Sequence, residues 1–209
     1  QRTEQLMALF YLLSLYAFIR GTESSPRLWH PLAVAACALG MASKEVMATA
    51  PVLILLYDRT FVAGSFRTAL RQRWPLYTAL ASTWLLLAWL VLGSHLDQRG
   101  AGFNLGVSPA DYALTETRVL LHYLWLSLWP HPLVFDYGWD FARRLADVWP
   151  FAVALTALAT AILWALWRRP MIGFLACWFF VILIPTSSFV PISEQPMAES
   201  RVYLPLAAV

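Results

Sequence analysis

The chain has 209 residues, of which 60% are hydrophobic and only 13% are charged, and its mean hydropathy is +0.60. Charged residues normally make up about a quarter of a soluble domain. This composition therefore excludes a soluble domain and indicates an integral membrane protein. The net charge of +3 comes from arginines scattered in short loops, which is typical of a membrane-topology signal and not of a nucleic-acid-binding patch.

The apolar residues fall into blocks separated by short polar stretches. Several blocks approach the ~20 residues that cross a hydrocarbon core about 30 Å thick as a helix. They lack the alternation of strands, and only helices or closed barrels satisfy every backbone polar group in lipid, so the blocks predict helices. In chain order the predicted segments are 5–19, 31–43, 46–57, 74–93, 149–167 and 171–186, with another beginning at 203. The sequence therefore predicts an all-α, polytopic transmembrane helix bundle, as a single domain over residues 1–209.

Arginine-rich loops orient the predicted bundle, since loops rich in Lys and Arg stay on the cytoplasmic side. The arginines of the predicted inner loops are Arg20 and Arg27, then Arg59, Arg67, Arg71 and Arg73, then Arg168 and Arg169. This orientation leaves residues 1–4, 43–45, 94–148 and 185–201 on the outer face. The segment 112–130 begins with a polar turn, so we expect an interfacial or re-entrant helix within an outer loop over 94–148, although Arg143 and Arg144 count against this placement.

Charged clusters lie at the membrane boundary on the predicted outer face, and charges at such depths indicate function by default. The first cluster is Arg2 and Glu4, which lead directly into a predicted span. Snorkelling or helix capping is the structural alternative for such residues.

The second cluster is Ser43-Lys44-Glu45, which joins two apolar segments almost without a loop and contains the only lysine of the chain. Ser43 is predicted to cap the following helix, and Glu45 to complement its dipole. Capping does not explain Lys44, whose charge opposes that dipole. An ammonium group beside free backbone N–H groups suits a phosphate, so Lys44 is a candidate phosphate ligand.

The third cluster is Glu199-Ser200-Arg201, just before Tyr203. An arginine fork can clamp a phosphate, and Glu199 can bind a sugar hydroxyl, whereas a local ion pair is the structural alternative. Arg118, in the predicted interfacial helix, and Tyr203 are weaker candidates.

Neither metal ligation nor a cofactor is predicted. The two cysteines, Cys37 and Cys177, lie inside apolar blocks and are expected to be free buried thiols. No residues have the spacing of metal ligands, so no metal site or cofactor is assigned, and a requirement for a divalent metal is left open.

Three sequence elements resemble one known family. They are Gln1 to Leu13, then Met41-Ala-Ser-Lys-Glu45 with Leu56-Tyr-Asp-Arg59, then Pro185-Thr-Ser-Ser188 with Glu199-Ser-Arg-Val-Tyr-Leu-Pro205. Together they resemble the multi-spanning part of bacterial relatives of the transmembrane, tetratricopeptide-containing O-mannosyltransferases. That family is similar to the C-type glycosyltransferases, which take a sugar from a polyprenyl-phosphate carrier on the outer or lumenal face.

The resemblance implies a transferase that moves a hexosyl or mannosyl group from a polyprenyl-phosphate sugar to a protein hydroxyl or a surface glycan, with inversion at the sugar carbon. It places Lys44 and Arg201 at the carrier phosphate, and Glu4 in an outer acidic cluster. Glu45 and Glu199 are further candidates for the sugar site. The implied location is the bacterial inner membrane, with the active face in the periplasm and the lipid bilayer as a partner.

The family's catalytic acid is expected in the first outer loop, before Gln1, and its tetratricopeptide repeats are expected after the last spans. We therefore expect a chain truncated at both ends, and no catalytic residue is assigned. Two other functions stay open: a transporter or flippase of a lipid-linked or anionic substrate, and a non-catalytic membrane scaffold for a repeat domain. The scarcity of ionisable groups in mid-span disfavours a transport pathway.

Overall fold

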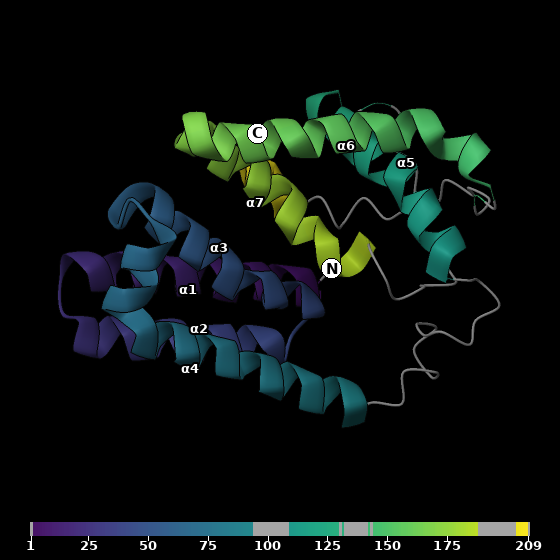
Figure 1. Cartoon of the computed structure of the whole chain (residues 1–209). Coiled ribbons are helices and arrows are strands. Elements are labelled where there is room, and N and C mark those ends of the chain that lie inside the picture. Colours follow the sequence, from purple (N-terminus) through teal and green to yellow (C-terminus); the bar gives the residue numbers. More distant parts are fainter. Residues whose placement is uncertain are drawn as a thin grey trace. The chain divides into compact units, whose positions relative to one another are not determined.

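The computed structural model describes residues 2–93, 109–129, 131, 142, 144–187 and 204–208. Within these ranges the regular structure is entirely helical, which confirms the predicted all-α class (Figure 1). The chain divides into two compact units, Gln1–Ser94 and His95–Val209, and each is described by itself. The single transmembrane domain expected over residues 1–209 stays a prediction.

Some of the helices have the length and composition of membrane spans. In the described part of the chain, three helices are long and apolar enough to cross a membrane, namely Thr3–Glu23, Phe66–Gly93 and Ala146–Arg168. Pro170–Pro185 is a shorter apolar helix. At 1.5 Å per residue, a helix of about 20 residues reaches the ~30 Å of a hydrocarbon core, so these elements support a membrane location.

The first unit contains α1 (Arg2–Glu23), α2 (Pro26–Met41), α3 (Ala50–Tyr57) and α4 (Phe66–Gly93). Helix α2 begins before the apolar segment predicted at 31–43, because Pro26 lies at its start, where a missing N–H is tolerated. Arg27 and His30 belong to the first turns of α2, although their polarity is typical of a loop.

Helix α3 is the central part of a continuous helical run. The 3₁₀ helix η1 (Glu45–Thr49) precedes it directly, and the π-helix η2 (Asp58–Val62) follows it. Gly64 then turns the chain with a φ of 73°, a left-handed conformation that favours glycine. The run and the turn bring the chain back to the start of α4.

Side-chain hydrogen bonds fix the register of the helical segments in the first unit. The Ser14 hydroxyl of α1 donates to the Ala33 carbonyl of α2 at 2.8 Å, and the Tyr11 hydroxyl lies 2.9 Å from Thr49 Oγ1. The Trp84 indole of α4 donates to the Ala48 carbonyl at 2.9 Å. The rings of Tyr16 and Trp29 also meet, with 5.9 Å between their centroids. Because Tyr16 follows Ser14 in α1 whereas Trp29 precedes Ala33 in α2, the two helices are antiparallel.

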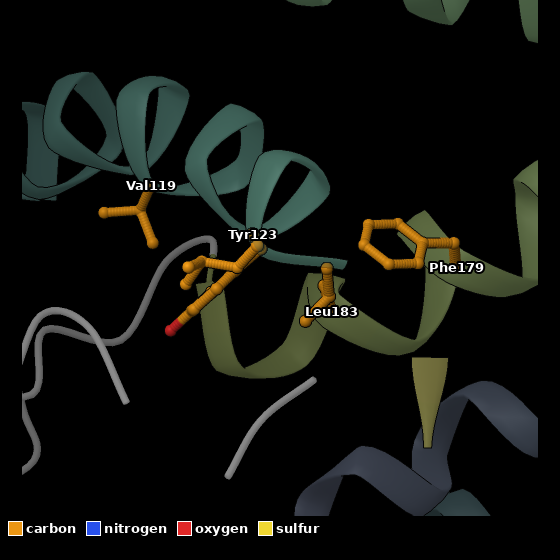
Figure 2. Close-up of a cluster of buried hydrophobic side chains, with 5 residues drawn as sticks. Val119, Tyr123, Phe179 and Leu183 are labelled. Atoms are coloured by element: carbon orange, nitrogen blue, oxygen red, sulfur yellow. The ribbon is translucent and has the colours of Figure 1, made fainter. Parts of the chain in front are cut away.

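The second unit contains α5 (Pro109–Leu128), α6 (Leu145–Arg168), α7 (Pro170–Ser187) and the 3₁₀ helix η5 (Pro205–Ala208). Side chains of α5 and α7 form its buried cluster, as Figure 2 shows for Val119, Tyr123, Phe179 and Leu183. The Trp178 indole of α7 donates to the Leu204 carbonyl at 3.2 Å, which ties the last described segment to this unit. The long helix α6 exposes most of its apolar side chains, as a lipid-facing span does.

Candidate functional site

The first two predicted charged clusters meet in the structure. The Lys44 ammonium donates to Glu4 Oε1, and the two residues form a salt bridge. Their side chains are largely enclosed, with 19% of Lys44 and 14% of Glu4 exposed. The salt bridge connects the first turn of α1 to the turn between α2 and η1.

The antiparallel packing of α1 against α2 explains this meeting. The Ser14–Ala33 hydrogen bond aligns the middle of the two helices, so the start of α1 lies beside the end of α2. Lys44 has an extended backbone, with φ −163° and ψ 145°, and it occupies the N-cap position of η1. Its side chain is thereby free of the helix and reaches back to Glu4.

The predicted cap at Ser43 is wrong. The Ser43 hydroxyl donates backward to the Leu39 carbonyl at 3.1 Å, and Lys44 takes the N-cap position without a side-chain capping bond. A serine hydroxyl readily bonds the carbonyl four residues before it at a helix end, and that local bond competes with capping. Glu45 is the first residue of η1 and is exposed, so its carboxylate is positioned to complement the helix dipole, as expected.

The remaining predicted site residues are not brought to this pair by the described structure. Arg2 is the first residue of α1, and its side chain is outside the described part. Glu199, Arg201 and Tyr203 lie outside the described residues. Arg118 is an exposed residue of α5 in the second unit.

A second charged cluster lies at the opposite end of the first unit, and the sequence patterns did not indicate it. Asp58 is fully buried and accepts two hydrogen bonds from Arg73 Nη1, at 2.9 and 3.1 Å. The Tyr77 hydroxyl donates to Asp58 Oδ2 at 2.6 Å. Asp58 directly follows an apolar segment and belongs to the Leu56-Tyr-Asp-Arg59 element of the resemblance, and either signal could have identified it.

His30 lies close enough to this cluster to be influenced by it. Burial and the charge of Arg73 lower the pKa of His30 from its ordinary value of 6.5, while the charge of Asp58 raises it. His30 Nε2 is buried and has no hydrogen-bond partner among the described residues. The neutral imidazole is therefore the favoured form beside the Arg73 guanidinium.

The second unit holds a further buried carboxylate that the sequence did not single out. Glu116 of α5 is only 2% exposed. The neighbouring Thr115 hydroxyl donates to the Asp111 carbonyl at 2.8 Å and accepts the Ala142 N–H at 2.9 Å. A carboxylate enclosed in this way is a candidate functional group of the second unit.

No group of three potential metal ligands is found in the described part of the chain. Cys37 is a free, buried thiol, and Cys177 is free and partly buried. What the described site offers chemically is a fixed ammonium group held by a carboxylate at a helix turn, which suits recognition of an anion.

The first part of the chain is similar to a known protein family. Residues 1–92 match the family model of the dolichyl-phosphate-mannose-protein mannosyltransferases. The matched segment contains all of α1, α2 and α3 and nearly all of α4, and so includes Glu4, Lys44, Asp58 and Arg73. Neither a curated protein nor a solved structure matches the chain.

Proposed function

Starting from the relation of this chain to the O-mannosyltransferase-type glycosyltransferases, we propose that it forms part of an enzyme that transfers a sugar from a polyprenyl-phosphate carrier. The proposed acceptor is a protein hydroxyl or a surface glycan. The proposed location is a bacterial inner membrane, with the transfer on its periplasmic face. The observation that carries the proposal is the family match over residues 1–92, which contains the Glu4–Lys44 salt bridge.

Lys44 is the proposed ligand of the carrier phosphate in this segment. It is the only lysine of the chain, and it lies at the end of a helix pair that begins with the span Thr3–Glu23. A carrier lipid presents its phosphate at the boundary of the hydrocarbon region, which is the depth expected for the end of such a helix. Glu4 keeps the ammonium in place, so little side-chain freedom is lost when the phosphate arrives.

The chemical step defines what Lys44 contributes. The bond between the anomeric carbon of the sugar and the phosphate oxygen breaks, and the acceptor oxygen bonds to that carbon from the opposite side, which inverts it. The departing electron pair stays on the phosphate, where the Lys44 ammonium stabilises the added charge. The acceptor proton passes to a general base, and none of the residues of this chain is assigned that role.

Other predicted residues complete the proposed site. Arg201 is proposed as a second ligand of the phosphate, because a guanidinium matches phosphate oxygens in a bidentate arrangement. Glu45 and Glu199 are proposed to accept hydrogen bonds from sugar hydroxyls. Arg118 and Tyr203 are the weaker candidates for the sugar or the acceptor.

The test uses the full-length protein, purified in detergent and supplied with polyprenyl-phosphate mannose and a hydroxyl-bearing acceptor. We expect Lys44→Ala to lower kcat/KM by about 100-fold or more, the range seen when one charge-stabilising donor is removed from an active site. Lys44→Arg should retain part of the activity because it keeps a cation. Arg20→Gln is the matched control, since it breaks an exposed salt bridge to Glu23 at the other end of α1.

Two outcomes would contradict the proposal. Full transfer by Lys44→Ala excludes a role for this ammonium at the phosphate. Absence of transfer by the wild type, together with movement of the lipid-linked sugar across a proteoliposome membrane, indicates a flippase instead.

A further inference from the structure

The first turns of α4 differ from the rest of that helix. Arg73 has φ −126° and ψ 30°, so the helix is kinked between its basic start and its apolar span. Pro75 explains the kink, because it cannot donate to the Arg71 carbonyl and its ring clashes with that turn. The basic segment Phe66 to Gln72 therefore has its own direction.

Apolar and basic side chains form separate rows along this basic segment. Phe66 and Leu70, four residues apart, are 46% and 43% exposed, while Ala69 is fully buried against the first unit. Arg67 and Arg71, also four residues apart, are exposed beside them. Residues at this spacing share a helix face, so an apolar stripe runs alongside a basic stripe.

The basic stripe lines a hollow. Arg67, Thr68, Arg71 and Gln72 line an open depression with a volume of about 630 Å³. Within the part of the chain that the structure describes, no carboxylate forms a salt bridge with Arg67 or Arg71, whereas Asp58 binds Arg73 and Glu23 binds Arg20. Arg67 and Arg71 therefore both line this open depression, and no carboxylate among the described residues neutralises them.

Local contacts hold the segment in place. Ser65 Oγ accepts the Thr68 N–H at 3.1 Å and lies 2.8 Å from the Thr68 hydroxyl, which caps the start of α4. The Arg59 guanidinium lies 5.4 Å from the centroid of the Phe66 ring. This cation–π contact orients the aromatic ring and brings a third cation to the same end of the unit.

We propose that the segment Phe66 to Gln72 binds the headgroup of an anionic glycerophospholipid. The Arg67 and Arg71 guanidinium groups bind the phosphate, and the Thr68 hydroxyl and the Gln72 amide contact the rest of the headgroup. Phe66 and Leu70 insert among the acyl chains. A soluble phosphate would satisfy the arginines but would leave these two apolar side chains in water, so the apolar stripe favours a lipid. This site lies at the opposite end of the first unit from Glu4 and Lys44, and it is independent of the proposed sugar transfer.

The experiment measures retention of phosphatidylglycerol by the purified full-length protein, using native mass spectrometry from mixed micelles that also contain phosphatidylcholine. Each arginine near an anionic lipid contributes about a five-fold change in affinity, so Arg67→Gln with Arg71→Gln should weaken retention roughly 30-fold. The matched control is Arg168→Gln with Arg169→Gln, which removes the same charge from the end of α6 and should leave most of the retention.

Further variants and competing ligands distinguish a glycerophospholipid from other anions. Phe66→Gln with Leu70→Gln should also weaken retention if the apolar stripe contacts acyl chains, and unchanged retention overturns that contact. Equal loss in the two arginine double variants shows general charge attraction and overturns the site. Displacement of the lipid by millimolar inorganic phosphate, or a loss confined to polyprenyl phosphate, overturns the assignment to a glycerophospholipid. Monodisperse elution of every variant controls for folding.

Discussion

The Arg73 guanidinium donates from a single nitrogen to both carboxylate oxygens of Asp58, at 2.9 and 3.1 Å. Asp58 ends the apolar run of α3 and is fully buried, and Arg73 marks the kink of α4 with 17% of its side chain exposed. One of the arginines that oriented the predicted topology is therefore also a structural partner of a buried carboxylate. This salt bridge joins two helices at the end of the first unit.

Replacing Asp58 should destabilise the first unit. Asp58→Ala leaves the Arg73 charge and the Tyr77 hydroxyl without their shared acceptor, and removal of one partner of a buried ion pair costs about 3–5 kcal/mol. Unfolding in mixed detergent and SDS, followed by tryptophan fluorescence, measures the change. Glu23→Gln is the control, because its salt bridge to Arg20 is exposed and should contribute less than about 1 kcal/mol. Equal effects of the two variants would refute the structural role of Asp58.

The variant Glu4→Gln should show whether Glu4 only positions the Lys44 ammonium or takes part in the chemistry itself. If Glu4 only holds the Lys44 ammonium, its neutral variant should lower kcat/KM by about ten-fold, less than Lys44→Ala does, because the cation stays near the site. The loss should appear in assays with the polyprenyl-phosphate sugar and be smaller at saturating concentrations of it. A larger loss for Glu4→Gln than for Lys44→Ala would assign the carboxylate a direct role in the chemistry.

Two glycines should respond differently to alanine. A Cβ at Gly173 would lie 2.6 Å from Leu166 Cα, and backbone cannot move away, so Gly173→Ala should destabilise by about 1–3 kcal/mol. A Cβ at Gly40 would meet the Met47 side chain, with Sδ at 2.6 Å, and a flexible thioether can adopt another rotamer. Met47 is fully buried and its Cγ would also lie at 2.7 Å, so Gly40→Ala should still destabilise in SDS unfolding, but less than Gly173→Ala does. Similar losses in both variants would contradict this reading of the α6–α7 packing.

The free energy of unfolding should fall as the pH is lowered through the range in which His30 of the unfolded chain becomes protonated. The pKa of His30 is lowered in the folded state by burial and by Arg73, so below pH ~6.5 the unfolded chain binds more protons than the folded one. The free energy of unfolding should thus decrease between pH 7 and pH 5. His30→Gln should flatten that dependence, whereas His131→Gln, at an exposed position, should not. If the free energy of unfolding of His30→Gln depends on pH as steeply as that of the wild type, His30 is not the source of the pH dependence.

Sequence reasoning singled out Lys44 and Glu4 but not the contact between them, and their roles in a functional site stay predictions. Lys44 and Glu4 were each expected at the outer boundary, because a charge next to an apolar block is visible in the sequence. Their salt bridge was not predicted, since it joins residues 40 positions apart through the packing of α1 on α2. The roles of Glu199, Arg201 and Tyr203 stay predictions, because these residues lie outside the described part of the chain.

The start of α2 and the cap of η1 show a different limit. Pro26, Arg27 and His30 are polar or helix-breaking by type, yet they form the first turns of α2. A proline is tolerated in the first turn of a helix. The hydrophobicity of a segment does not show where that first turn lies, so the start of α2 at Pro26 was not predicted. Serine is a good capping residue by type, but the Ser43 hydroxyl donates its hydrogen bond to the nearby Leu39 carbonyl instead.

The amino-acid sequence by itself determined that this protein is helical and embedded in a membrane. Transfer of apolar blocks into lipid depends on their own composition and length, and the backbone within them must then form its hydrogen bonds locally. Only the tertiary structure decided which carboxylate each cation meets, Glu4 for Lys44 and Asp58 for Arg73. Those pairings depend on how helices distant in sequence pack against each other, because a salt bridge forms only where the packing brings both charges within a few ångströms.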